Sequence, residues 1–584
     1  MTKCGWENFD NWIHCICVVT FDLELGQALE AIYPSHVKLS ETERSNVCYL
    51  AFPDSNSGCM GDTRYHVRIR RNFLESQDNT SRKEYNRKSP AFLQCSEDYY
   101  WGYIYFRQVK NHDLPRGYFQ KSVVIVSMLP FVNLFGELCA LLAQEFFESG
   151  NTIMEVAIRE IDQWLPPTPG ELINLHLLGV LFQTYIPNEN YKANVASITG
   201  IDNASDPSSV QPVRKLIMAS ALEDDMFQSL LNIISHVHLL WELVLLNEPI
   251  LVMAGSPKTC ANMVQALVAM IVPFKYCSDY RPYFTIHDSE FKEYTSDVAV
   301  PPAVILGVTN PFFAKTLQRW PHIIRVCDVT NNDSKKYKIK KVDSLKILDS
   351  KPGVYTQYKT FLQKDKTLLK KLIRGVQTKR PREVQAALLK RHLMELTESF
   401  MIPLERYIAS LMPLQKNISP FKVYRFSDMI RCQNQVIFFI ATPIPQLFNP
   451  EDFLATVSTA GPQLTIGIKG DWAGLYKRFF RTPNFSGWFN LRYSELTHKL
   501  QALQLEALSH AVKLNLNNDL KTWVQDKQEV EIIDMILKIR QKLEISHSED
   551  IPTTQAVRVR LSERLNDITR TLPDDLKVIL KHES

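Results

Sequence analysis

The sequence predicts an α/β fold built from three consecutive modules, and three patterns support this prediction. Residues 1–165 place strand-like apolar runs before segments of helical periodicity, the order of a sheet covered by packed helices. Residues 166–332 combine buried strand-like runs with amphipathic helices, as in a central α/β module. Residues 355–584 carry apolar residues mainly at helical spacing, so we expect an all-helical C-terminal module.

The N-terminal module is expected to form a sheet with helices packed on it. A polar turn and a short helix near residues 40–46 follow the first predicted strand. From Phe131 the apolar residues recur every three or four positions, which predicts a helix, and a second helix over residues 152–164 stops before Pro166. Five apolar runs predict the strands, at residues 12–21, 48–52, 65–71, 99–109 and 117–129.

The central module contains a strand, a turn and a helix in the order of a phosphate-binding loop. The apolar run at residues 249–254 predicts a buried strand, Ser256 is the expected N-cap, and Pro257 suits the first helical turn. A phosphate-binding loop needs G-x-x-x-x-G-K-[ST], whereas only Gly255 is present here. We therefore expect a structural unit without nucleotide chemistry. Later strands of the module are predicted at residues 303–308 and 322–329.

Three segments differ from the modules around them. Residues 187–213 are polar and rich in turn formers, which indicates a mobile insertion. Residues 333–354 form a lysine-rich connector, interpreted either as a solvated linker or as a segment weakly attracted to an anionic membrane. Residues 423–447 are β-prone within the otherwise helical module. The expected helical stripe of that module is clearest at Leu389, Leu393, Leu396 and Phe400.

Composition and charge exclude several classes of protein. A formal charge of +4 on 584 residues argues against a dedicated nucleic-acid-binding protein. No segment approaches about 18 uninterrupted apolar residues, so we expect no membrane-spanning helix. Eleven cysteines without paired spacing fit reduced thiols in a cytoplasmic protein. Cys15 and Cys17 would lie on one face of a strand, where we expect buried thiols rather than metal ligands.

The residue types of covalent catalysis are present but not arranged for it. His287, Asp288 and Ser289 are consecutive in a loop, and three adjacent residues do not converge as a catalytic relay. The acidic run at residues 223–225 fits a helix start or a solvated turn better than a metal site. No nucleophile elbow, zinc-protease or kinase motif occurs. We expect no catalytic residue, no metal and no cofactor.

One turn carries a candidate functional residue. The loop KNHDLPRGY, residues 110–118, joins two strong strands and places Arg116 and Gly117 at its tip. In the simpler interpretation Gly117 supplies the turn conformation and Arg116 is merely exposed. In the functional interpretation Arg116 enters a GTPase active site and stabilises charge on the transferred phosphoryl group.

Long strings of the sequence are similar to one family. FDLELGQALEAIYP, YLAFPDSNSG and RGYFQKSVVIVS resemble the longin-type upstream module of DENN-domain proteins. LWELVLLNEPILVMAGSP, VPFKYCSDYRPYFTIHDSEF and VILGVTNPFF resemble the central DENN module, and GPQLTIGIKGDWAGLYKRFF resembles the helical downstream module. The match is closest to the sixth DENN-containing subfamily. Residues 423–441 depart from that pattern, as an insertion or a splice variant would.

The resemblance implies a guanine nucleotide exchange factor for a Rab GTPase of endosomal recycling. Such proteins are cytoplasmic and associate peripherally with recycling endosomes. In the family, the GTPase contacts a surface between the longin and central modules. Carried over to this sequence, that surface predicts contacts from residues 278–282 and 307–312, namely from Asp279, Tyr280, Arg281 and Asn310.

Two other functions remain open. Longin–DENN proteins of the folliculin type use an arginine in an Arg-Gly-aromatic turn as a GTPase-activating finger, and Arg116-Gly117-Tyr118 resembles that turn. The chain would then accelerate GTP hydrolysis rather than GDP release. As a non-catalytic adaptor, it would instead bind a Rab and change neither rate.

Overall fold

The protein is described here by a computed structural model. Two compact units divide the chain: Met1–Ser399 with Gln463–Phe485, and Phe400–Pro462 with Ser486–Ser584. The structure describes residues 8–24, 26–54, 59–72, 80–113, 117–189, 215–218, 226–295, 301–317, 319–326, 352–412, 446–460, 462, 468–515 and parts of 533–571.

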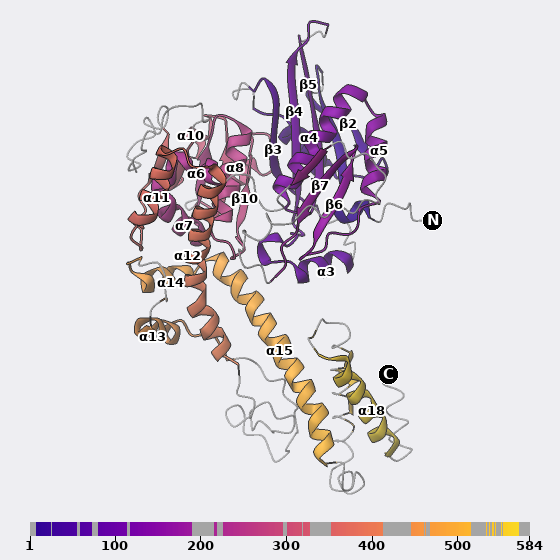
Figure 1. Ribbon diagram of the computed structural model, residues 1–584, viewed down its shortest axis with the longest axis vertical. Coiled ribbons are helices and arrows are strands. Elements are labelled where there is room, and N and C mark those ends of the chain that lie inside the picture. The colour runs from indigo at the N-terminus through magenta and orange to yellow at the C-terminus, as the bar shows by residue number, and fades with distance from the viewer. Residues whose placement is uncertain are drawn as a thin grey trace. The chain divides into compact units, whose positions relative to one another are not determined.

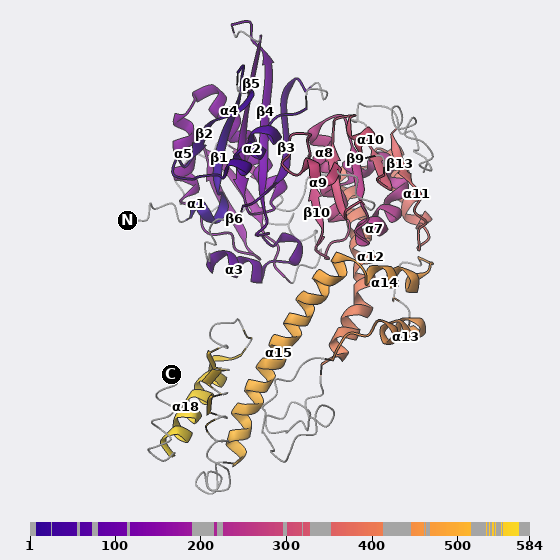
Figure 2. The ribbon, with the colours of Figure 1, turned by 180° about the vertical axis from the view of Figure 1, so that it is seen from behind.

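The first unit begins with a five-stranded antiparallel sheet (Figure 1). Helices lie on both faces of it (Figure 2): Phe52, directly after α2, packs on Phe106 of β4, whereas Phe135 of α4 stacks on Tyr103 of the same strand. Its strands, in spatial order, are β2 (Gly26–Tyr33), β1 (Cys15–Asp22), β5 (Tyr118–Ser127), β4 (Tyr99–Lys110) and β3 (Gly61–Arg70). Its helices are α1 (Phe9–Trp12), α2 (Glu41–Leu50), α3 (Thr80–Lys88), η2 (Ala91–Leu93), α4 (Val132–Ser149) and α5 (Thr152–Ile161).

Two predictions for this sheet are wrong. Residues 48–52 are not a strand, because α2 extends to Leu50 from a capping box at Ser40 and directs Val47 and Leu50 into the core. Residues predicted as a polar turn after the first strand instead form the edge strand β2, whose residues are only partly buried. An edge strand with little burial lacks the apolar alternation that marks a strand in sequence. The other predicted strands of the module are confirmed.

A small second sheet extends the N-terminal core. Strands β6 (Leu172–Leu177) and β7 (Val180–Tyr185) form a hairpin whose turn residues Leu178 and Gly179 have φ of +50° and +75°. Strand β8 (Lys215–Met218) pairs in parallel with β7. Alternate side chains of the hairpin are buried in the N-terminal core, although its residues follow position 165.

The central sheet has the order β10–β11–β9–β12–β13, with only its last pair antiparallel. Ser256 caps α8 by accepting a hydrogen bond from the Thr259 amide, as predicted. Its strands are β9 (Ile250–Met253), β10 (Asp279–Arg281), β11 (Val304–Val308), β12 (His322–Arg325) and β13 (Gly353–Thr356). Its helices are α6 (Met226–Leu230), η4 (Leu231–His236), α7 (Val237–Leu245), α8 (Pro257–Ala269), α9 (Phe291–Thr295) and α10 (Phe313–Thr316).

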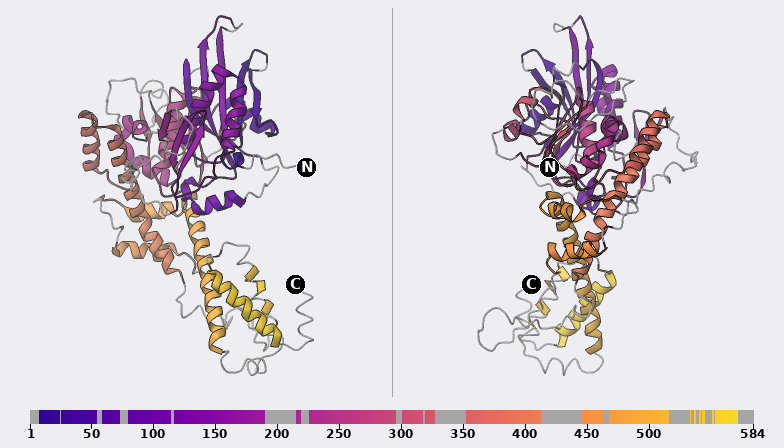
Figure 3. Two further views of the ribbon diagram at one scale, coloured as in Figure 1. Left: turned by 45° about the vertical axis from the view of Figure 1, so that its right-hand side comes forward. Right: turned by 90° about the vertical axis from the view of Figure 1, so that its left-hand side faces the viewer.

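The rest of the described chain is mainly helical. The first unit also holds α11 (Lys366–Gln377), α14 (Trp472–Phe479) and the start of α12 (Arg382–Ser410). The predicted stripe of α12, residues 389–400, is buried. In the second unit, Leu505 of α15 (Pro483–Asn515) packs with Val557 and Leu561 of α18 (Gln555–Thr571), which lies beside it in Figure 3. The remaining helix of that unit is α13 (Pro450–Ala460).

Several predictions concern regions that the structure does not describe. The proposed insertion lies mostly in them, as do the connector lysines, the acidic run at 223–225 and nearly all of the β-prone segment at 423–447. The prediction of helix from residue 355 is wrong at its start, because Tyr355 and Thr356 belong to β13 and pair with β12. Among the described helices, none combines the length and apolarity needed to cross a bilayer.

Candidate functional site

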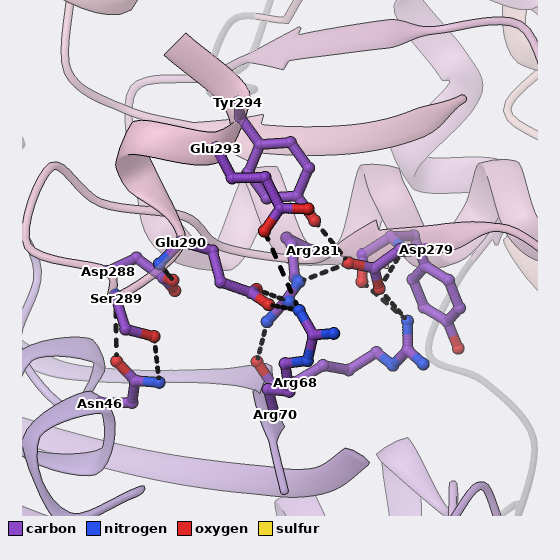
Figure 4. Close-up of polar contacts among 11 residues, drawn as sticks. Asn46, Arg68, Arg70, Asp279, Arg281, Asp288, Ser289, Glu290, Glu293 and Tyr294 are labelled. Atoms are coloured by element: carbon purple, nitrogen blue, oxygen red, sulfur yellow. Dashed lines mark hydrogen bonds and ion pairs between the residues drawn. The ribbon is translucent and has the colours of Figure 1, made fainter. Parts of the chain in front are cut away.

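The N-terminal and central modules of the first unit meet where β3 runs beside β10. Arg68 and Arg70 are two positions apart on β3, so both side chains lie on one face of the strand and point toward the central module. The residues that they meet come from β10 and from the loop that leads into α9, as Figure 4 shows. We call this set of charged residues the junction cluster: Arg68, Arg70, Asp279, Arg281, Asp288 and Glu290.

Arg68 joins the modules through three kinds of contact. Its Nη1 donates to Asp279 Oδ1 at 3.0 Å and to the Tyr280 carbonyl at 2.9 Å. The guanidinium carbon lies 4.1 Å from the centre of the Tyr99 ring and 4.0 Å from that of Tyr280. Because its side chain is only 8% exposed, these contacts are shielded from water and are stronger than a surface ion pair.

Arg281 occupies the middle of the cluster and is 1% exposed. Its Nε donates to Asp279 Oδ2 at 2.8 Å, and its Nη2 pairs with Glu290, which also accepts from Arg70. Tyr294 donates its hydroxyl to Asp279 Oδ2 at 2.8 Å. Each buried charge therefore has an opposite charge or a hydrogen bond, as the cost of desolvating it requires.

Two carboxyl groups of the cluster have pKa values shifted in opposite directions. Burial by itself would raise the pKa of Asp279, but Arg281 and Arg68 together hold that pKa below its ordinary value. Burial raises the pKa of Asp288 to about 6, against a smaller lowering by Arg281. Asp279 is therefore ionised at neutral pH, whereas Asp288, with a pKa of about 6, titrates close to neutral pH.

A second contact between the modules lies at the carboxyl end of β11. Thr309 donates its hydroxyl to Asp54 Oδ2 at 2.8 Å, and the Tyr283 hydroxyl oxygen lies 2.8 Å from the Asp54 amide, which donates to it. Gly307 permits the close approach of the backbone, since a Cβ there would lie 2.2 Å from the Pro282 carbonyl oxygen. Together with the junction cluster, this contact holds the two modules at two separated places.

Beside that second contact, both modules present side chains to solvent. Phe312 is 48% exposed and Ile286 is 36% exposed. The His287 ring stacks on Tyr49 of α2 at 4.8 Å. Asn310 accepts a hydrogen bond from the Phe312 amide at 3.0 Å, which fixes the turn. We call this surface the junction rim: Tyr49, Ile286, His287, Asn310 and Phe312.

The predicted contact residues divide between the interior and the surface. Asp279, Tyr280 and Arg281 are brought together, and their side chains contact Arg68 or Glu290 where the modules meet; Arg281 is 1% exposed. Asn310 lies at the junction rim. A direct contact of any of them with a GTPase stays a prediction.

Arg116 lies outside the described residues. The residue that follows it supports the predicted turn, because Gly117 adopts a φ of +72° in the left-handed region. The Gly117 carbonyl also accepts a hydrogen bond from the Asn111 amide at 2.9 Å, which closes the loop.

Sequence reasoning missed Arg68, Arg70, Glu290 and Asp54. A signal for the arginines was present, since YHVRIRR places them two apart in a predicted strand with buried neighbours. Charged residues in a half-buried strand need partners, so that pattern indicates a strand that faces other protein. No local signal marks Glu290 or Asp54.

The consecutive residues His287, Asp288 and Ser289 do not converge on one another in the structure. His287 stacks on Tyr49, Asp288 is buried beside Arg281, and Ser289 bonds Asn46, so the three side chains point to different partners. Cys15 and Cys17 are buried with their sulfurs 3.8 Å apart, as two thiols on one strand face. Within the described ranges, no three His, Cys, Asp or Glu side chains are grouped to hold a metal.

Comparisons with known proteins agree with this architecture. The DENN (AEX-3) domain family matches residues 118–331, the Transport protein Avl9 family matches 13–163, and the DENND6 C-terminal domain family matches 520–583. Protein DENND6A of Gallus gallus is 47% identical over 98% of this chain and 94% of its own length. The chain belongs to the DENND6 family. Among other members, Protein DENND6B of Homo sapiens is 46% identical over 98% of this chain and 94% of its own length.

Membership indicates the general class of partner. DENN-domain proteins act in general as exchange factors for Rab GTPases in membrane trafficking. The likeness also reaches distant organisms: a DENND6 homolog of Dictyostelium discoideum is 30% identical over 91% of this chain and 77% of its own length. The junction of this DENND6 chain lies between the residues matched to the Avl9 family and the later part of the DENN match.

Proposed function

We propose that this chain promotes GDP release from an endosomal Rab GTPase, which binds across the junction rim. The observation that carries this proposal is that two modules, fixed to each other by a buried ion network, jointly present an exposed surface. Exchange requires no bond chemistry from the protein. It requires tighter binding of the nucleotide-free GTPase than of its GDP-bound form.

The rigidity of the junction supports this role. A surface built from two separately mobile modules would lose conformational freedom on binding, and that loss would weaken the complex. Here the junction cluster and the Asp54–Thr309 contact restrict that freedom before the partner arrives. More of the binding free energy is then available to distort the GTPase switch regions.

We further propose where the chain acts. As a cytoplasmic protein attached peripherally to recycling endosomes, it would meet a Rab that is already on that membrane. Family membership supports this location, since DENN-domain proteins act in trafficking. Fluorescence microscopy of the tagged chain with a recycling-endosome marker tests it, and a uniformly cytoplasmic signal would contradict it.

The first experiment measures fluorescent GDP release from a panel of purified Rabs. We expect the wild-type chain to accelerate release from one or a few of them. Phe312→Glu should reduce that acceleration at least tenfold, because a charge in the centre of an apolar contact must be desolvated. The matched control is Val384→Glu, at an exposed valine of α12 that is not among the rim residues, which should retain the wild-type rate.

Arg116→Ala distinguishes the other two functions. An exchange factor should release GDP equally well with and without Arg116. Acceleration of GTP hydrolysis that is lost in Arg116→Ala would instead establish an activating protein. Binding to a GTP-loaded Rab with neither rate changed would establish an adaptor and overturn the proposal.

A further inference from the structure

A cavity of about 640 Å³ lies in the N-terminal module, away from the junction rim. It opens at the end of the first sheet where β3 finishes and β4 begins, between the loop before α2 and helix α3. Neighbouring residues of β4 separate it from the junction cluster: Tyr99 faces Arg68, whereas Tyr100 on the opposite face lines the cavity. Its volume is that of a site for a small molecule.

Cationic side chains from three segments line this cavity. Lys38 comes from the loop before α2, Arg71 follows β3, and Arg82 belongs to α3. Arg71 is held with its guanidinium carbon 5.4 Å from the centre of the Tyr100 ring. Its Nη1 makes one long hydrogen bond, of 3.4 Å, to the Glu97 carbonyl. Arg71 is therefore positioned by an aromatic ring, and within the described residues no carboxylate forms an ion pair with it.

Two carboxyl groups also line the cavity, and they differ in their contacts. Glu43 accepts from the Ser40 amide and hydroxyl at 2.9 Å each and from the Asn72 amide at 3.0 Å. That carboxylate is therefore occupied in capping α2. Asp10 is the second, and burial raises its pKa although His36 and Arg82 act in the opposite direction. Because Asp10 lines the cavity and a carboxyl group can accept a hydrogen bond in either protonation state, Asp10 offers an acceptor there.

The electrostatic environment of His14 reflects the cations around it. The His14 ring stacks on Tyr100 with centroids 4.7 Å apart. The pKa of His14 is lowered to about 4, mainly by burial; Glu43 opposes this lowering, and Arg71 and Arg82 contribute to it. A bound anion would offset the electrostatic effect of the two arginines, so the pKa of His14 should rise when an anion occupies this cavity.

We propose that this cavity binds a phosphorylated polyol of the inositol phosphate class. Lys38, Arg71 and Arg82 supply charge-assisted hydrogen bonds to phosphate oxygens, and Asp10 accepts from ring hydroxyls. The same chemistry is offered by a free inositol phosphate and by the headgroup of a phosphoinositide lipid. The cavity shares no lining residue with the junction rim, so its binding can be tested separately from nucleotide exchange.

The first test is calorimetric titration of the full chain with inositol 1,4,5-trisphosphate, with pyrophosphate as the comparison anion. We expect saturable binding of the inositol phosphate that is at least tenfold tighter than that of pyrophosphate. Lys38→Ala, at an exposed loop position, should weaken it about tenfold, which corresponds to about 1.4 kcal/mol. Lys110→Ala, at the opposite end of β4, is the matched control and should bind like the wild type.

A second readout addresses the ionisation of His14. Bound trisphosphate should raise the pKa of His14, followed by NMR of the ring protons, and Lys110→Ala should show the same rise. Absence of saturable binding, or equal binding of pyrophosphate and trisphosphate, would overturn the proposal. Binding that persists unchanged in Lys38→Ala and Arg71→Gln would overturn it as well.

Vesicle sedimentation then identifies the source of the ligand. Phosphatidylcholine vesicles with phosphatidylinositol 4,5-bisphosphate are compared with vesicles of equal charge that contain phosphatidylserine. Stronger capture by the phosphoinositide, lost in Lys38→Ala, indicates a membrane headgroup. Binding of the soluble trisphosphate without such capture indicates a free inositol phosphate. Equal capture by both vesicles, without binding of the soluble trisphosphate, would show nonspecific attraction to anionic lipid and contradict the proposal.

Discussion

Arg281 is nearly inaccessible to solvent, and its surroundings explain how a buried guanidinium is tolerated. It lies between Asp279 and Glu290, and Glu290 in turn pairs with Arg70 from the N-terminal module. Removing one member of such a buried set leaves charges that water no longer solvates. The family resemblance predicts Arg281 as a contact with the GTPase, and in the structure Arg281 joins the two modules.

Replacing this arginine should destabilise the first unit. We expect Arg281→Met to lower the free energy of unfolding by about 3–5 kcal/mol, because the buried Glu290 and the partly buried Asp279 then have less compensating charge. Denaturant unfolding followed by tryptophan fluorescence measures the change.

The matched control for Arg281→Met is an arginine of β3, in the N-terminal sheet of the same unit. Arg64 pairs with Glu137 at 2.6 Å, and its side chain is 38% exposed. Since partly exposed ion pairs contribute little, Arg64→Met should change the free energy by no more than about 1 kcal/mol. Equal effects of the two substitutions would show that burial of the cluster does not determine its importance.

At the scale of elements, the close approach of β11 to the loop after β10 depends on Gly307. A methyl group there would meet the Pro282 carbonyl oxygen at 2.2 Å and the Cys260 sulfur at 2.8 Å. The Pro282 backbone cannot move aside as the end of a flexible side chain can. We expect Gly307→Ala to lower the thermal unfolding midpoint, at a cost of about 1–3 kcal/mol or more.

Gly136→Ala is the opposite test within a helix of the same unit. A Cβ at Gly136 of α4 meets nothing within 4 Å. Alanine should therefore stabilise the helix by up to about 1 kcal/mol. If both alanine substitutions shifted the midpoint in the same direction, close packing at Gly307 would not be the cause.

Elements with strong periodicity were predictable, whereas the edge strands β2 and β13 were not. Strand β9 and helix α8 follow from an apolar run, a Gly-Ser-Pro turn and a serine cap. Strands β2 and β13 lie at the two outer edges of their sheets, and each pairs with one neighbour only. Pairing at an edge is decided by the adjacent strand, which a local pattern does not reveal.

At the scale of the whole molecule, α7 and α12 of the first unit are joined by two buried histidines. The Nε2 atoms of His238 and His392 lie 3.2 Å apart, so one ring donates to the other only when at least one is neutral. Burial is the largest cause that lowers the pKa of both rings, and burial together with His392 brings the pKa of His238 to about 4. Asp365 raises the pKa of both rings, and Lys364 lowers the pKa of His238.

The sign of the resulting pH dependence follows from those shifts. A folded-state pKa near 4, below the unfolded value of 6.5, means that the unfolded chain binds the proton more tightly. Stability should be intact above pH 6.5 and decrease as the pH falls toward 4, with His238 alone accounting for about 2 kcal/mol by pH 5. Unfolding midpoints at pH 7 and pH 5 measure this.

Substitutions test whether His238 and His392 cause this loss of stability at low pH. His392→Gln can keep a hydrogen bond to His238 while removing one titrating ring, so it should make the midpoint less sensitive to pH. His176→Gln, at an exposed position of β6, is the control and should leave the sensitivity unchanged. An unaltered pH dependence in His392→Gln would assign the acid sensitivity to other groups.

The sequence by itself determined the α/β class and the family, because hydrophobic periodicity and long matching strings are local properties of the chain. Tertiary structure decided which polar residues face solvent. Arg281 is buried and Asp279 partly buried where β3, more than 200 residues earlier, brings Arg68 against them, while Asn310, next to the Thr309 that bonds Asp54, stays partly exposed. Burial of a charge depends on its partners in space, and those partners are set by how distant strands meet rather than by neighbours in sequence.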